Sequence, residues 1–183
     1  GWFRIKHRAA VVAILHPFEL RQIQLKVGDP ITPDQKKAIV DWVQWGGQLI
    51  INGPSSLDLL KGSFLEAYLP ATNDGPRKIA GDDPAIAELN ANWLVSTART
   101  PGEPLKVTAP WSAIKLKLHA DAKPLPKTGG LFVERQVGRG RIVVSAVQIS
   151  ERDLINWRSG FQSFFNACLL RRPARKYIPG QFG

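Results

Sequence analysis

The residues of this sequence that could act as a catalytic nucleophile are Ser55, Ser56 and its single cysteine, Cys168. A serine needs a base that accepts its proton and an acid that orients the base. A cysteine needs an accessible, electropositive setting that favours the thiolate. Cys168 stands among apolar residues of an expected helix, so we predict that it packs in the core rather than reacts.

The two serines close a turn that runs from Ile51 to Ser56 and follows a short apolar run. The later histidine, His119, stands near Asp121, but the alternation of its segment places it on a solvated face beside lysines. Nothing in the sequence brings it to Ser55. The simpler interpretation is that Ser55 or Ser56 caps a helix that starts at Leu57. A hydrolase or amidotransferase-like enzyme with a serine at this turn is the alternative.

A candidate ligand pocket lies at the strand ends, where open α/β sheets place their ligands. Its expected members are His16 and Glu19 after the first apolar run, and Asn52, Gly53, Ser55 and Ser56 after the second. The three histidines lack metal-ligand spacing, and a single cysteine excludes a multi-cysteine zinc site. We therefore expect no metal and no cofactor.

The elements that must position these residues alternate between strand and helix. An apolar strand is expected at Ala9–His16, and Thr32, Pro33 and Gln35 give a capping box that starts a helix ending at Gly46-Gly47. The further predictions are a strand at 48–52, a helix at 57–68, a loop at 69–82, a short helix from 83 to 92, a loop at 100–104, a strand at 114–119, a hairpin of 131–136 with 141–147, and a helix at 160–170.

The segment Val137-Gly138-Arg139-Gly140-Arg141 could hold a phosphate, because glycine lets backbone N–H groups converge and arginine adds charge. It joins two strands rather than a strand and a helix, so a tight hairpin turn explains it better. The sequence also has six tryptophans. Those near element ends either fill the core or form an interaction surface, and the sequence leaves both open.

The chain has 183 residues, 44% of them hydrophobic, which suits one domain with a sizeable core. We expect that domain at 1–170 and a basic, extended tail at 171–183. The net charge of +10 is concentrated near both ends, so specific nucleic-acid binding is not expected. Attraction of the basic ends to an anionic surface, through the segment from Arg171 to Lys176, is a second alternative.

Several motifs together resemble class I glutamine amidotransferase-like domains, in the branch found inside uncharacterised bacterial membrane-associated proteins. They are ITPDQKKAIVDWVQWGGQLIINGP at 31–54, Leu69-Pro70, and VERQVGRGR at 133–141 with the apolar strand after it. Trp157 and the aromatic helix at 161–165 follow in the expected order. The resemblance covers roughly residues 9–170. The first strand and helix of active members have no clear match.

The resemblance implies an α/β fold: a flavodoxin-like three-layer sandwich with a mainly parallel sheet and a C-terminal hairpin. Active members carry a cysteine on the sharp turn after the central strand, and no cysteine occupies the matching turn at 51–56. The expected function is thus a non-catalytic domain that binds a protein or a small molecule, or serves as a scaffold.

We expect the chain to be part of a larger bacterial protein, in which any membrane contact is made by parts outside this sequence. No run approaches the ~20 apolar residues that span a bilayer. The compartment is left open. One expectation is the extracytoplasmic, soluble part of a membrane-anchored protein.

Overall fold

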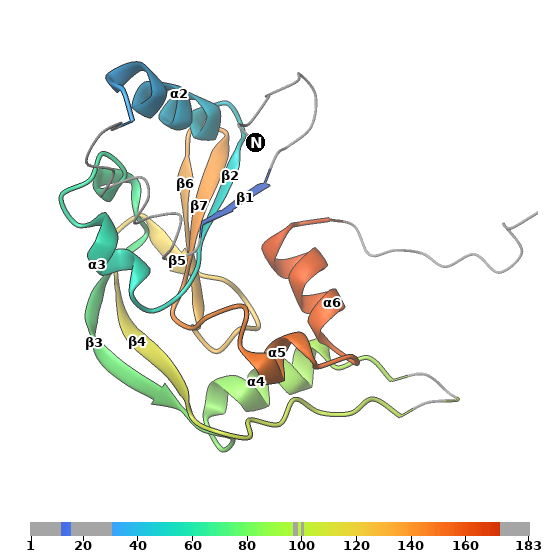
Figure 1. Cartoon of the computed structure of the whole chain (residues 1–183). Helices are drawn as coiled ribbons and strands as arrows, with labels where there is room; N and C mark the ends of the chain where they lie inside the picture. Colours follow the sequence, from blue (N-terminus) through green and yellow to red (C-terminus); the bar gives the residue numbers. More distant parts are fainter. Residues whose placement is uncertain (1–11, 16–30, 97–98, 100, 173–183) are drawn as a thin grey trace, which may run out of the picture.

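The computed structural model of this protein describes residues 12–15, 31–96, 99 and 101–172 (Figure 1). The first expected strand is therefore seen at 12–15. Two members of the candidate pocket, His16 and Glu19, lie outside the described residues, as does the expected tail from 173 onward.

The main sheet has five strands in the order β1 (Val12–Leu15), β2 (Gln48–Ile51), β7 (Gly140–Ser145), β6 (Phe132–Val137) and β5 (Ala122–Pro124). The first three are mutually parallel, and the β6 strand pairs antiparallel with both β7 and β5. Within this sheet β6 alone runs against the other four strands. The predicted mainly parallel α/β sheet and its hairpin are confirmed, whereas β5 was not predicted.

A separate two-stranded sheet pairs β3 (Ala71–Ile79) with β4 (Trp111–Leu118) and arches beside the main sheet in Figure 1. The predicted loop at 69–82 is thus wrong. Its glycine, proline and asparagine residues sit in a bulge between Asn73 and Pro76, where Gly75 adopts a φ of +106°. A bulge accommodates such residues without ending the strand. The strand expected at 114–119 is confirmed and starts three residues earlier.

The predicted starts of two helices are confirmed. The α2 helix (Pro33–Gln44) has Thr32 as its cap, with the reciprocal bonds of a capping box to Gln35 at 3.2 and 2.9 Å. The α4 helix (Pro84–Trp93) is capped by Asp83, whose carboxylate accepts the Ala85 N–H at 2.9 Å. Local sequence therefore defines both beginnings.

The other helices differ from the prediction. The helix expected at 57–68 is two pieces, α3 (Ser56–Leu60) and the 3₁₀ turn η1 (Glu66–Tyr68), separated by a turn in which Gly62 has a φ of +74°. The closing helix starts as α6 (Phe161–Ser163) and continues as a π-helical segment, η2 (Phe164–Leu169). A short α5 (Arg152–Ile155) precedes it and was not predicted.

Alternating residues of the central strands feed two apolar clusters, one on each face of the main sheet. Leu49 and Ile51 join the cluster of α2 and α3, while Ile50 joins that of α4, α5 and η2. The same alternation along β7 sends Val144 to the first cluster and Val143 to the second. Helices therefore cover both faces, as an apolar strand that is buried on both sides requires.

Candidate functional site

The turn after β2 begins with Asn52, which is fully buried. Its backbone N–H donates to the Leu15 carbonyl at 2.9 Å, which extends the β1–β2 pairing by one residue. Its side-chain Oδ1 accepts the backbone N–H of Ile149 at 2.7 Å. The residue therefore ties β2 both to its neighbouring strand and to the segment that follows β7.

The two serines of this turn have different surroundings. Ser56 is fully buried, and its hydroxyl donates to the carbonyl of Asn52. Ser55 is exposed and precedes α3, but its side chain makes no capping bond. Ser55 is thus the cap residue by position only, and the helix begins at Ser56 rather than at the predicted Leu57. Of the described members of the candidate pocket, Asn52, Gly53 and Ser56 are buried and Ser55 alone is exposed.

His119 lies just past the end of β4, where its backbone N–H donates to the Pro70 carbonyl at 2.9 Å. Its side chain lines a depression of about 170 Å³ beside α3, together with Leu57, Asp58, Lys61, Glu66, Leu69, Ala71, Thr72 and Asn73. No hydrogen bond joins it to either serine in the part of the chain that the structure describes. The histidine and the turn therefore do not form a serine–histidine pair here.

Asp121, the acid nearest to His119 in sequence, is bound elsewhere. The Arg135 Nε donates to its carboxylate at 2.7 Å, and this hydrogen bond holds the pKa of Asp121 below its usual value. Arg135 also donates to the carbonyls of Ala67 and Leu69. The carboxylate is thus part of a surface ion pair between β6 and the turn before β5, and the same arginine ties β6 to the segment before β3.

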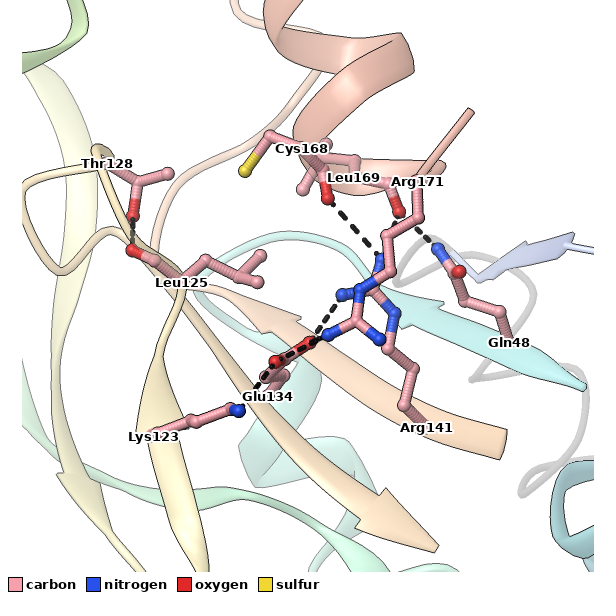
Figure 2. A network of polar contacts seen from close by, with 9 residues as sticks. All are labelled: Gln48, Lys123, Leu125, Thr128, Glu134, Arg141, Cys168, Leu169 and Arg171. Carbon is pink, nitrogen blue, oxygen red and sulfur yellow. Dashed lines mark hydrogen bonds and ion pairs between the residues drawn. The ribbon is translucent and has the colours of Figure 1, made fainter. Parts of the chain in front are cut away.

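The motif VERQVGRGR builds a buried ionic cluster between β6, β7 and the end of η2 (Figure 2). Glu134 and Arg141, both buried, form an ion pair. The Glu134 carboxylate also accepts from Arg171 at 2.7 Å, and the Lys123 ammonium lies 3.7 Å from it. Three cations thus surround one carboxylate.

Backbone carbonyls at the end of η2 supply the remaining acceptors. Arg141 donates to Leu169 and, at 3.4 Å, to Cys168, while the side-chain amide of Gln48 donates to the same Leu169 carbonyl (Figure 2). The negative end of a helix stabilises nearby cations. Burial lowers the pKa of Arg141 from its usual value, but the Glu134 hydrogen bond acts against that shift. The cluster fastens η2 to the sheet.

Cys168 is buried beside this cluster, and burial raises the pKa of its thiol to about 11. A protonated, buried thiol reacts slowly with electrophiles. The environment of Cys168 is therefore that of a packing residue.

The turn of the β6–β7 hairpin interlocks with the end of α2. The Arg139 N–H donates to the Gln44 carbonyl at 2.8 Å. A Cβ on Gly138 would lie 2.6 Å from that carbonyl oxygen, and one on Gly140 would lie 2.0 Å from the Val43 oxygen. The glycines of this turn permit the close approach of two backbones. This packing accounts for the glycines without a bound phosphate.

Arg139 is the residue of this motif that extends outward. Its guanidinium carbon lies 5.6 Å from the ring centroid of Trp45, whose side chain is 76% exposed. The sequence left open whether a tryptophan near an element end fills the core or forms a surface, and the structure shows that Trp45 does not fill the core. Helical spacing alone does not reveal this, because Trp45 is the cap residue that follows the last helical residue of α2.

A second depression, of about 310 Å³, lies between the segment after α4 and the start of α6. It is lined by Val95, Pro101, Arg158, Ser159, Gly160, Gln162 and Ser163. Neither depression includes a residue of the turn at 52–56. Among the described residues, no group of three histidine, cysteine, aspartate or glutamate side chains could hold a metal, and no helix is long and apolar enough to cross a membrane.

No protein-family model and no curated protein matches this chain. Among solved structures, the cytoplasmic protein STM3548 from Salmonella typhimurium is similar with a TM-score of 0.52 and 15% identity, over 84% of this chain and 68% of that one. The cytoplasmic protein STM1381 from Salmonella typhimurium LT2 gives a TM-score of 0.46 and 18% identity, over 81% of this chain and 63% of that one.

The exo-beta-1,4-mannosidase Op5Man5 from Opitutaceae bacterium strain TAV5 gives a TM-score of 0.42 and 16% identity, over 77% of this chain and 24% of that one. This chain spans less than two thirds of the length of STM1381, at 63%, and about a quarter of the length of the mannosidase, at 24%. The likeness to STM3548 concerns the α/β fold alone.

Proposed function

We propose that this protein is a non-catalytic binding domain with a flavodoxin-like, class I glutamine amidotransferase-like architecture. In this proposal, the turn after β2 corresponds to the turn that carries the catalytic cysteine in active members of that class. The turn has taken on a structural role, and the domain acts by binding a protein or a small molecule.

The observation that carries the proposal is the burial of Asn52 at the end of β2. A nucleophile must be exposed at such a turn to meet its substrate. Here the first side chain of the turn bonds to Ile149 in the interior, and the Ser56 hydroxyl bonds back to the Asn52 carbonyl. The side chains of Asn52 and Ser56 are thus occupied by the fold itself.

Two further features support the proposal. Pro54 has no backbone N–H, so it has no donor to offer an oxyanion. Ser55 is exposed, yet it has no histidine as a hydrogen-bond partner among the described residues. An exposed serine without a base has the ordinary, weak nucleophilicity of an alcohol.

Labelling with a fluorophosphonate, which reacts with activated serines, tests this proposal. We expect the intact mass of the full chain to stay unchanged under conditions that fully label a serine hydrolase. Ammonia release from glutamine should equal that of buffer. An adduct that maps to Ser55 or Ser56 and disappears in Ser55→Ala or Ser56→Ala would overturn the proposal.

A further inference from the structure

The strongest unexplained surface feature is the pair formed by Trp45 and Arg139. Among the large hydrophobic residues of the described part of the chain, Trp45 is the most exposed, at 76%, and Val95 follows at 49%. Trp, Tyr and Arg are enriched at the energetic centres of protein interfaces. The fold does not need the Trp45 ring, because most of it lies in solvent.

The backbone of both residues is held in place although the side chains are exposed. Trp45 donates its backbone N–H to Asp41 and so closes the last turn of α2, while the Arg139 N–H is bound to Gln44. The contacts of Gly138 and Gly140 with the same helix end fix the hairpin turn. Rigid anchors lose little conformational entropy when a partner binds.

The guanidinium of Arg139 is available to a partner. The other two arginines of the motif are occupied, Arg135 by Asp121 and Arg141 by Glu134. Arg139 makes no ion pair with any described residue. A guanidinium that lies over an aromatic ring can still use its in-plane N–H groups, and these match the two oxygens of a carboxylate.

We propose that Trp45 and Arg139 form a docking site for a protein segment that carries a carboxylate next to an apolar side chain. Arg139 would bind the carboxylate, and the Trp45 ring would cover the apolar neighbour. This inference names the partner class for the binding role proposed above and rests on that role.

The charges near the pair favour a protein over a nucleic acid. Lys37, Asp41 and Trp45 follow one another at four-residue spacing on α2, and the Lys37 ammonium lies 2.6 Å from the Asp41 carboxylate. A chain of phosphates that ran from Arg139 along this stripe would meet the Asp41 carboxylate. A peptide with one acidic group meets charges of both signs without that repulsion.

Selection from a random peptide library on the immobilised full chain tests the proposal, with counter-selection against the variant Trp45→Ala/Arg139→Ala. We expect the enriched peptides to share an aspartate or glutamate beside a large apolar residue. For a synthesised peptide of that group, calorimetry should show at least a tenfold weaker affinity for Arg139→Ala and for Trp45→Ala. Replacing the peptide's carboxylate by an amide should have a similar effect.

Matched control variants are Arg152→Ala and Ile155→Ala, an exposed arginine and an exposed apolar residue on α5. They should leave the affinity within twofold of the wild type. Arg139→Lys should bind more weakly than the wild type, because an ammonium lacks the planar fork. Circular dichroism of each variant should match that of the wild type.

The proposal is overturned if no enriched peptide depends on the pair, or if the selected peptides lack a carboxylate. It is also overturned if a single-stranded oligonucleotide binds through the pair more tightly than these peptides. These outcomes are independent of the serine labelling. A reactive Ser55 would refute the non-catalytic function without changing the selection, and a failed selection would leave the labelling result unchanged.

Discussion

At the carboxyl end of β2, Asn52 and Ser56 turn their polar groups inward and bond to the backbone. At the opposite end of the strands, where the β6–β7 hairpin meets α2, Trp45 and Arg139 face solvent. Open α/β sheets usually bind ligands at the carboxyl end of their strands. In this molecule the described groups at that end are mostly occupied, whereas Trp45 and Arg139 at the amino end are available.

The amino end also has an inner part. Glu134 and Arg141 lie beneath η2, while Arg139, two residues before Arg141 in the chain, reaches the surface. One motif therefore combines a buried ionic cluster that secures a helix with an exposed cation that nothing in the fold requires. The following predictions test this division between structural and available groups.

The largest effect is expected at the inner cluster. The substitution Glu134→Ala leaves Arg141 buried without its carboxylate, and breaking a buried pair in this way costs about 3–5 kcal/mol of unfolding free energy. Urea denaturation measures the change.

Asp121→Ala, which removes the carboxylate of an exposed arginine pair, should cost far less and serves as the control. The double variant Glu134→Leu/Arg141→Met should recover much of the loss, because an apolar pair of similar size leaves no unpaired charge. A loss below about 1 kcal/mol for Glu134→Ala would show that the cluster does not hold η2 in place.

The second effect concerns Cys168. Its folded pKa of about 11 lies two units above the ordinary value of 9.0, so the thiolate fraction at pH 8 falls on the order of a hundredfold. Alkylation by iodoacetamide at pH 8 should therefore be slower by at least that factor in the folded chain than in urea, as followed by mass spectrometry. Equal rates would contradict the packing role.

The same shift makes stability depend on pH. Because the folded pKa is raised, the contribution of the protonated thiol is complete below pH 9 and is lost as the pH rises toward 11. The difference in unfolding free energy between the wild type and Cys168→Ser should decrease over this range.

The third effect is at the carboxyl end. The substitution Asn52→Ala removes the acceptor of the buried Ile149 N–H, and an unsatisfied buried donor costs about 1–3 kcal/mol. The control is Asn92→Ala, an exposed asparagine on α4 whose side chain bonds only to the helix backbone. If both variants unfolded at the same urea concentration, Asn52 would not be a structural residue.

Local signals in the sequence were sufficient for α2, α4 and the hairpin, because capping residues and glycine turns act over three or four positions. The strand β3 was missed because its bulge residues are typical of loops and only the pairing with β4 makes them a strand. The break at Gly62 was missed for a related reason, since the apolar spacing continues across it.

At the candidate site, the sequence predicted that Cys168 packs in the core and that His119 is not brought to Ser55. It did not reveal where Arg139 lies relative to the sheet. Alternation along a strand distinguishes its two faces, but a hairpin turn has no such period. The exposure of Trp45 follows from how the hairpin turn and the helix end meet, which is a tertiary contact and leaves no local pattern.

The smallest effect is expected at the outer pair. An exposed cation–π contact contributes about 0.5–1 kcal/mol, so Trp45→Ala and Arg139→Ala should each lower the unfolding free energy by no more than about that amount. Together they should cost less than the sum of the two, because each removes the same contact. By contrast, Val43→Ala, a buried position two residues earlier on the same helix, should cost about 2 kcal/mol. A loss above 2 kcal/mol for Trp45→Ala would mean that the ring supports the fold. The pair would then be a structural contact rather than a docking site for a partner.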